Sequence, residues 1–288
     1  MTIAIAIPTY NRGAILVDTL ARLLPLGADA VIVVDQTPAH PPDVETRLAS
    51  WAASGAIAWI RLEQPSIPKA MNRALETART DLVLFLDDDI EPDPALVREH
   101  VAAHADPSVW AVAGQVLQPG EVPVPAERTN DDLGFRFNSD TPAFITNVMA
   151  GNLSVKRERA LSIGGFDENF IGVAYRFESD FALRLVGAGG RIRFEPRASI
   201  RHLQLPTGGT RTYGDHRTSP SPMHSVGDYY FALRHRPDFW RYVLTRLRKN
   251  VLTRYHLGRP WAVAPKVVGE VRGLLLARRL WRQSRDKG

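Results

Sequence analysis

Short apolar runs alternate with amphipathic segments through about the first hundred residues of the chain. The apolar runs are bounded by polar residues and have the length of β-strands, whereas the segments between them have the 3.6-residue spacing of helices. The expected strands are 3–7, 30–34, 57–62 and 82–86, and the expected helices are 14–24, 42–54 and 69–79. Strands that alternate with helices in this way are typical of a parallel sheet covered on both faces. The pattern therefore predicts an α/β domain.

Polar clusters follow three of these strands directly. They are Pro8–Arg12, Asp35–Thr37 and Asp87–Asp89. Because functional residues in open α/β sheets gather at the carboxyl ends of the strands, we expect the three clusters to form one site.

The remainder of the chain divides into three parts. Segment 120–142 is rich in Pro, Asp, Asn and Thr and predicts a long surface loop, and 205–222 predicts a second loop. Helical spacing resumes near Ser225. We expect one domain over 1–222, with halves 1–118 and 119–222, followed by a helical tail over 223–288.

Composition and charge narrow the function classes. The chain has no cysteine, which excludes disulfides, thiolate zinc sites and cysteine nucleophiles. Residues 229–288 hold 15 Lys/Arg and 3 Asp/Glu, while the preceding residues hold 21 and 28. The basic character therefore belongs to the tail. Segment 3–7 is too short for a signal peptide, and no apolar run is long enough to span a membrane.

The acidic run Asp87-Asp88-Asp89 is the strongest sign of chemistry. Adjacent carboxylates repel one another, so such a run at a strand end is typical of a site that a cation neutralises. Oxygen ligands favour Mg²⁺ or Mn²⁺. The alternative is an acidic, solvated turn.

Several motifs occur in the order and spacing of a known family. They are Ile7-Pro-Thr-Tyr-Asn-Arg12, Val33-Val-Asp35, Leu86-Asp-Asp-Asp89, Gly151-Asn-Leu-Ser154, Gly164-Gly-Phe-Asp-Glu168 and Glu178-Ser-Asp-Phe-Ala-Leu-Arg184. Over about residues 3–202 the chain resembles an inverting family 2 glycosyltransferase of the GT-A fold. The resemblance implies a Rossmann-like, mainly parallel sheet flanked by helices, with the basic helical tail as an addition.

The resemblance also implies roles for individual residues. Within 1–118, those expected to bind the nucleotide sugar are Pro8, Thr9, Tyr10, Arg12, Asp35, Lys69, Asn72, Asp87 and Asp88. Gly151 and Asn152, in 119–222, are expected to bind it as well. The expected ligands of Mn²⁺ or Mg²⁺ are Asp87, Asp89 and His202, although a lone histidine can also be structural.

The acceptor half, 119–222, is expected to provide the catalytic base. The resemblance places Glu178 in that role, with Asp180 as the next candidate; the alternative is charge complementarity at a helix N-terminus. Gly165, Phe166 and Asp167 are expected on the acceptor side, with a plain turn as the alternative.

Two positions depart from the family pattern. Met71 stands where relatives usually have Arg, so Lys69 is a candidate for the missing positive charge. The second strand ends in Asp35-Gln-Thr instead of the common Asp-Asp-Gly-Ser. Recognition of the base can therefore differ from that of relatives.

The tail combines aromatic, apolar and basic residues. Val267, Val271, Leu274, Leu275 and Trp281 share one helical face, and most arginines lie elsewhere. This pattern predicts peripheral association with an anionic membrane through 229–288, whereas the alternative is a helix packed on the domain. Nucleic acid is disfavoured as a partner because the apolar residues face one way.

The resulting hypothesis is a metal-dependent, inverting hexosyl- or related transferase. It would move a sugar from a UDP-, GDP- or dTDP-linked donor to a saccharide or lipid-linked acceptor in envelope polysaccharide or glycoconjugate synthesis. The expected location is the cytoplasm, at the inner face of the cell membrane. The rivals are a nucleotidyltransferase, whose glycine-rich phosphate loop is missing after the first strand, and a non-catalytic nucleotide-sugar-binding or scaffold protein. P-loop and H-E-x-x-H motifs are absent from the sequence.

Overall fold

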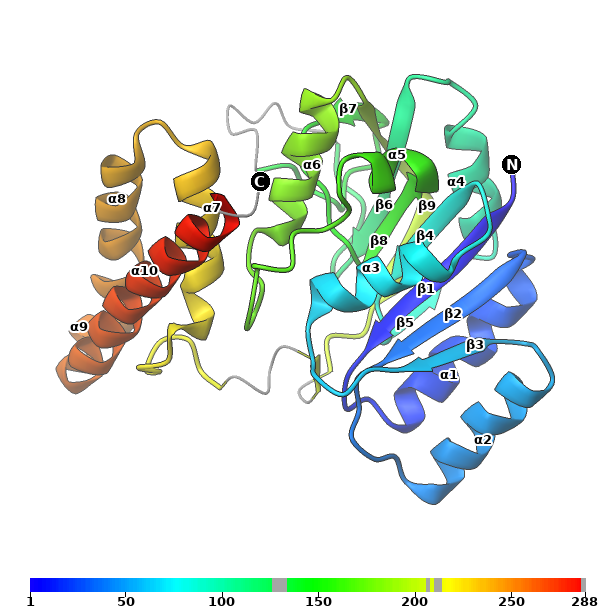
Figure 1. Cartoon of the computed structure of the whole chain (residues 1–288), viewed down its shortest axis with the longest axis horizontal. Coiled ribbons are helices and arrows are strands. Elements are labelled where there is room, and N and C mark those ends of the chain that lie inside the picture. The colour runs from blue at the N-terminus through cyan, green and yellow to red at the C-terminus, as the bar shows by residue number, and fades with distance from the viewer. Residues whose placement is uncertain (126–133, 206–207, 210–213, 286–288) are drawn as a thin grey trace. The chain divides into compact units, whose positions relative to one another are not determined.

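The computed structural model describes residues 1–125, 134–205, 208–209 and 214–285. The chain forms two compact units (Figure 1). Unit 1 comprises Met1–Phe166 and Phe181–Gly209, and unit 2 comprises Asp167–Asp180 and Thr210–Gly288. Residue 222, where the sequence analysis divides the chain, lies within unit 2, and so does the internal segment 167–180.

Unit 1 is built on a mixed sheet. In the described residues the strand order is β3-β2-β1-β4-β8-β6-β9-β5, and β7 pairs with β9. The strands are β1 (Ile3–Thr9), β2 (Ala30–Asp35), β3 (Ala58–Arg61), β4 (Leu82–Leu86), β5 (Ile90–Pro92), β6 (Val109–Leu117), β7 (Ala143–Ile145), β8 (Asn152–Lys156) and β9 (Arg191–His202).

Strands β1 to β4 are the four that the alternating pattern predicts, and they pair with one another in parallel. Beyond β4 the directions change: β8 is antiparallel to both neighbours, and β5 and β7 are antiparallel to β9. The predicted α/β class is confirmed; the half with regular β-α-β alternation is parallel, and the remainder is mixed, with β6 parallel to β9.

The helices of unit 1 include the three that the sequence predicts, α1 (Ala14–Leu23), α2 (Pro42–Ala53) and α3 (Ile67–Thr77). The others are the 3₁₀ turn η1 (Leu24–Leu26), α4 (Leu96–Ala103), α5 (Arg157–Ser162) and the later part of α6 (Phe177–Gly187). One apolar cluster joins alternate residues of β1 to the buried faces of α1, α2 and α4, including Leu16, Leu48 and Leu96. Helix α3 crosses the strands on the side facing the viewer in Figure 1.

Strand register brings the polar clusters of the sequence to one edge of the sheet. Thr9 at the end of β1 lies opposite Asp35 at the end of β2. The acidic run joins β4 to β5, and Ile90 of β5 lies opposite His202 of β9. The long strand β9 therefore returns the chain to the acidic run, although more than one hundred residues separate them in sequence.

Unit 2 is helical in its described part. Its helices are the start of α6, η3 (Pro222–His224), α7 (Val226–His235), α8 (Phe239–Val251), α9 (Arg254–Leu257), η4 (Pro260–Ala262) and α10 (Val263–Arg285). Helix α10 packs along α7 and η3. None of the helices traced in the structure is long and apolar enough to cross a membrane.

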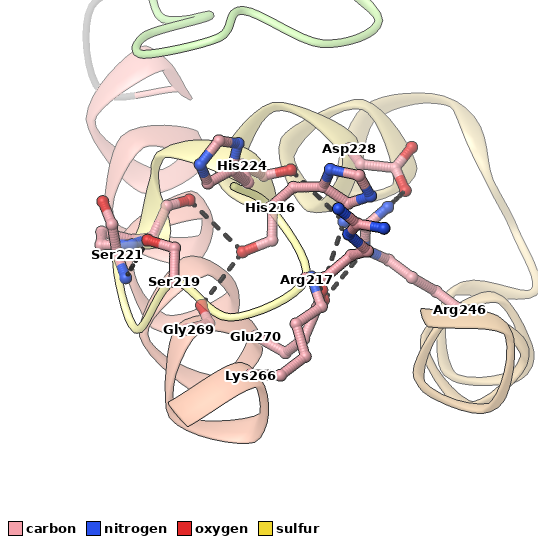
Figure 2. Close-up of polar contacts among 12 residues, drawn as sticks. His216, Arg217, Ser219, Ser221, His224, Asp228, Arg246, Lys266, Gly269 and Glu270 are labelled. Carbon is pink, nitrogen blue, oxygen red and sulfur yellow. Dashed lines mark hydrogen bonds and ion pairs between the residues drawn. The ribbon is translucent and has the colours of Figure 1, made fainter. Parts of the chain in front are cut away.

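Charged side chains are buried between these helices. Arg246 contacts Asp228 and donates from Nε to Glu270 Oε2 at 3.0 Å, and Lys266 Nζ lies 2.7 Å from Glu270 Oε1 (Figure 2). The exposed fraction of Asp228, Lys266 and Glu270 is 4% or less. We name Asp228, Arg246, Lys266 and Glu270 the unit 2 charge network.

Both predicted loops fall partly outside the described residues. Of segment 120–142, residues 126–133 lie outside, and the described part contains little regular structure apart from a bridge between Val124 and Ser139. Of 205–222, residues 206–207 and 210–213 lie outside.

Candidate active site

The three carboxylates after β4 point to different surroundings. The side chain of Asp87 is 46% exposed, whereas Asp88 and Asp89 are buried. Asp87 and Asp89 face His202, while Asp88 faces Thr9 and Arg12. The run is therefore not a solvated turn, because two of its members are buried with specific partners.

Asp87, Asp89 and His202 form a cluster that we name the strand-end triad. One ligand atom from each lies within 4.8 Å of the others. His202 Nε2 is 3.1 Å from Asp89 Oδ1 and 3.8 Å from Asp87 Oδ2. These are the three residues that the sequence analysis assigns to the metal.

The two ring nitrogens of His202 contact Gln118 and Asp89, an arrangement that suits a metal ligand. The Nδ1 atom lies 3.0 Å from the amide oxygen of Gln118, an acceptor, so this contact places a proton on Nδ1. Nε2 faces a carboxylate oxygen of Asp89, to which it donates a hydrogen bond when it also carries a proton. Two acceptors at 3.1 Å require a proton or a cation between them. Two carboxylates and one imidazole are a suitable donor set for a divalent metal.

Buried Asp88 is held by the loop that follows β1. Thr9 Oγ1 donates to Asp88 Oδ2 at 2.7 Å, and Arg12 Nε is 2.8 Å from Oδ1. Burial raises the pKa of Asp88 to about 7, against the lowering effects of Arg12 and Thr9. Two residues predicted to contact nucleotide, Thr9 and Arg12, thus organise the acidic run in the described structure.

Asp89 is more acidic than Asp88. Burial raises its pKa, but the hydrogen bond from His202 and the nearby charge of Arg12 outweigh burial, so the pKa lies below the usual range. Arg12 Nη2 is 3.3 Å from Asp89 Oδ2, and the Leu205 amide donates to the same oxygen at 3.3 Å. Asp89 is therefore ionised and fixed in orientation.

Gly151 packs directly against Asp87 and accepts a hydrogen bond from its amide. The Asp87 amide donates to the Gly151 carbonyl at 3.2 Å. A Cβ added at Gly151 would lie 2.1 Å from Asp87 Oδ2. A side chain here would displace the carboxylate, so the glycine is required by the close approach of Asp87.

Asn152 is completely buried beneath the sheet edge. Its Nδ2 donates to the carbonyls of Gln115 and Ala198 at 3.0 and 2.8 Å, and its Oδ1 contacts His100 Nε2 at 2.8 Å. Burial lowers the pKa of His100 to about 4, so the ring is neutral. Asn152, which is predicted to bind nucleotide sugar, ties β8 to β6 and β9 in the structure.

Asp35 is also fully buried and bound by protein donors. Oδ1 accepts from the Thr37 amide at 2.8 Å, and Oδ2 accepts from Trp59 Nε1 at 3.0 Å and lies 2.6 Å from His40 Nε2. Burial raises its pKa, but these hydrogen bonds outweigh burial and hold the pKa below the usual range. The ionised group therefore fixes the loop at 35–40 directly.

The remaining nucleotide candidates lie around the same edge. Pro8 and Tyr10 are half-buried, and the Tyr10 carbonyl accepts from Gly209 at 2.9 Å, which links the loop after β1 to the segment after β9. Lys69 is exposed in the first turn of α3. Asn11 and Gln204 have φ of 56° and 54°, a costly backbone conformation for residues other than glycine.

Asn72 and the double glycine form one arrangement. Asn72 donates to the Phe166 carbonyl at 2.9 Å and accepts from the Phe166 amide at 2.8 Å. A Cβ at Gly165, where φ is 64°, would lie 2.5 Å from Asn72 Oδ1. Phe166 is buried and stacks on Phe181 at 4.3 Å. Phe166 is therefore a core residue of unit 1, and Asn72 shapes the turn before it.

The predicted base candidates are placed differently within unit 2. Glu178 is half-buried at the start of α6. Asp180 is fully buried, and its Oδ1 lies 2.8 Å from His235 Nε2 and 3.2 Å from Arg234 Nε. Asp167, the acceptor-side candidate, pairs with Arg234 and accepts from Tyr230 at 2.9 Å.

Several residues of these networks carry no signal in the sequence. His40, Trp59, Gln118, Arg234 and His235 belong to none of the motifs, and their partners are 5 to 84 residues away. Gln118 follows directly after β6, so a search of every strand end would have included it.

Comparison with known proteins agrees with this geometry. Residues 4–163, more than half of the chain, match the model of Glycosyl transferase family 2. The chain belongs to glycosyl transferase family 2. The resemblance inferred from the motifs is thereby confirmed.

A curated relative of the family 2 chain is the Pre-mycofactocin glycosyltransferase of Mycobacterium tuberculosis, found in two strains. It is 29% identical over 206 residues, which cover 69% of this chain and 42% of the relative. The chain thus spans less than half the length of this relative.

Solved structures confirm the GT-A glycosyltransferase fold. GalNAc-T7 with UDP, GalNAc and Mn²⁺ is similar with a TM-score of 0.58 and 14% identity, over 70% of this chain and 44% of that protein. The mannosyltransferase PcManGT from Pyrobaculum calidifontis, in complex with GDP-Man and Mn²⁺, has a TM-score of 0.57 and 18% identity. The match covers 99% of this chain and 79% of that protein.

Proposed function

We propose that this family 2 protein is a divalent-metal-dependent glycosyltransferase that moves a sugar from a nucleoside-diphosphate donor to an acceptor hydroxyl with inversion. The observation that supports this proposal most strongly is the strand-end triad. A buried carboxylate, a half-exposed carboxylate and a histidine converge at the carboxyl edge of a family 2 sheet.

Asp87, Asp89 and His202 would hold the cation. When bound, the cation supplies positive charge that offsets the charge of the nucleoside diphosphate leaving group. The imidazole favours Mn²⁺ over Mg²⁺, since Mg²⁺ prefers an all-oxygen shell. Structures of both similar glycosyltransferases contain Mn²⁺.

The loop Pro8–Arg12 and the ends of β2 and β4 would bind the nucleotide. Arg12 keeps Asp88 and Asp89 in place, and Asp35 fixes the loop at 35–40 through Thr37. Lys69 is exposed at the positive end of α3, where it can approach the diphosphate. The donor class is a UDP-, GDP- or dTDP-sugar; the two similar structures contain UDP and GDP-Man.

Glu178 is the proposed general base. It would accept the proton of the acceptor hydroxyl while the oxygen attacks C1 of the sugar and the bond from C1 to the diphosphate breaks. A single displacement inverts the configuration at C1. Asp180 is better suited to positioning, because its carboxylate is buried and bound by His235 and Arg234.

The proposed acceptor is a saccharide or lipid-linked saccharide of envelope polysaccharide or glycoconjugate synthesis. Gly165 and Asp167 remain candidates for its side of the site. We also propose peripheral membrane association through residues 229–288, where a lipid-linked acceptor would be found.

Release of nucleoside diphosphate tests this function. A panel of UDP-, GDP- and dTDP-sugars is incubated with acceptor saccharides and Mn²⁺, and the wild type is compared with Glu178→Gln and with Glu158→Gln, an exposed carboxylate on α5. We expect Glu178→Gln to bind donor normally but to transfer at least about 100-fold more slowly, as expected for loss of a general base. Glu158→Gln should match the wild type.

The outcomes separate the alternatives. Full transfer by Glu178→Gln would assign the base to another residue. Donor binding without transfer to any acceptor, in the wild type, would favour a nucleotide-sugar-binding protein over an enzyme.

A further inference from the structure

Helix α10 of unit 2 buries the opposite face from the one its composition favours. Its buried residues are Lys266, Gly269, Glu270, Gly273 and Ala277. The glycines allow close packing, because a Cβ at Gly273 would lie 2.0 Å from Ser225 Oγ and one at Gly269 would lie 2.6 Å from the Ser219 carbonyl. Figure 2 shows Lys266, Gly269 and Glu270 directed toward the polar contacts of this interior. Small and charged residues therefore form the inner face.

Four large apolar residues of α10 lie on its outer face. Val267, Val268, Val271 and Leu275 are 38%, 46%, 49% and 60% exposed. In an ordinary surface helix, residues of this type face the core. Of the predicted apolar stripe, Val267, Val271 and Leu275 are thus exposed, whereas Leu274 and Trp281 are half-buried.

The outer face continues onto α8. Arg278 follows Leu275 by one turn of α10, and its guanidinium lies 4.9 Å from the ring centre of Trp240. Trp240 and Leu244 are one turn apart on α8 and are 58% and 63% exposed. We name this region the α8–α10 surface; it comprises Trp240, Leu244, Val267, Val271, Leu275 and Arg278.

The charge around the α8–α10 surface has one sign. From Phe239 to Arg285 the sequence contains 12 Lys/Arg and one acidic residue, Glu270. Glu270 is buried in the unit 2 charge network, so it does not offset the exposed arginines. Arg279, Arg282 and Arg285 are exposed on the turns that follow the apolar residues.

We infer that the α8–α10 surface docks on an anionic lipid membrane. Exposed apolar residues and tryptophan beside unopposed arginines match an interface in which side chains enter the acyl boundary and guanidinium groups contact lipid phosphates. The positive charge distinguishes a lipid surface from a second copy of this chain, because two such surfaces would repel each other. This inference rests on the proposed membrane association and assigns it to particular residues.

Vesicle sedimentation tests the assignment. The full chain is mixed with phosphatidylcholine vesicles with and without phosphatidylglycerol, at low and high salt. We expect binding that requires phosphatidylglycerol and weakens with salt. Val271→Ser/Leu275→Ser and Arg279→Gln/Arg282→Gln should each weaken binding about tenfold, since each pair contributes to partitioning. Controls are Val122→Ser and Arg98→Gln, exposed residues of unit 1.

Each outcome has one meaning. Unchanged binding by both double variants would overturn the α8–α10 surface but leave membrane association intact. Absence of wild-type binding would overturn both. A wild-type dimer in sedimentation velocity that Val271→Ser/Leu275→Ser converts to a monomer would assign the surface to a second copy instead. Donor binding, measured separately for each variant, should equal that of the wild type. Such a result would show that a change in vesicle binding does not come from damage to the donor site.

Discussion

Both units bury charged side chains, but the charges are balanced in unit 2 and unbalanced in the strand-end triad. The unit 2 charge network contains two cations and two anions, and each cation contacts a carboxylate (Figure 2). The strand-end triad contains two carboxylates and one histidine, and Arg12 Nη2 lies 3.3 Å from Asp89 Oδ2. The first arrangement pairs each of its cations with a carboxylate, whereas the second brings together ligand atoms that could hold a metal ion.

This difference separates structural charge from functional charge. Loss of one partner of a buried ion pair strongly destabilises the protein, because the other charge remains buried without a partner. Removing one of several clustered like charges relieves their repulsion, so the folded protein is not destabilised, but the cluster no longer binds a cation. The same substitution, carboxylate to amide, should therefore reduce stability strongly in the unit 2 charge network and change it little at Asp87.

The largest expected effect is on the stability of unit 2. Asp228→Asn removes the carboxylate that contacts Arg246 and Arg176 and accepts from Tyr242 at 2.6 Å. We expect the free energy of unfolding to fall by about 3–5 kcal/mol, as for other broken buried pairs. Urea denaturation measures the loss, with exposed Asp238→Asn as the control. A loss as small as that of the control would mean that the network is not a closed structural unit.

An intermediate effect is expected behind the triad. Gly151→Ala should push Asp87 out of place and weaken Mn²⁺ binding about tenfold, comparable to loss of a group that supports a metal ligand. Gly187→Ala is the matched control, because no atom lies within 4 Å of its added Cβ and its φ is not in the left-handed region. Equal Mn²⁺ affinities for the two variants would contradict the supporting role of Gly151.

The smallest expected effect is on stability at the triad. Asp87→Asn should change the free energy of unfolding of the metal-free protein by less than about 0.5 kcal/mol, since the side chain is 46% exposed and lies beside other carboxylates. Urea denaturation in EDTA measures this change. A loss similar to that of Asp228→Asn would show that Asp87 is structural.

The parallel half of the sheet could be predicted because it depends on local patterns, and the members of the triad were expected from the family resemblance. Apolar runs at regular spacing predicted β1 to β4, and the resemblance implied Asp87, Asp89 and His202 as metal ligands. The partners of Asp35 and Asp180 could not be predicted, because His40, Trp59 and His235 meet these carboxylates only through folding. The face of α10 that is buried could not be predicted either, because the helix packs closely through Gly269 and Gly273 and not through its apolar stripe.

The central claim is that the strand-end triad holds a cation through which the protein binds a nucleoside diphosphate. Calorimetric titration of UDP, GDP and dTDP, with Mn²⁺ or with EDTA, tests it in the wild type and in Asp89→Asn. The account predicts binding of one nucleotide that requires Mn²⁺ and is weakened at least about 100-fold in Asp89→Asn. Equal affinity with EDTA, or in the variant, would contradict it.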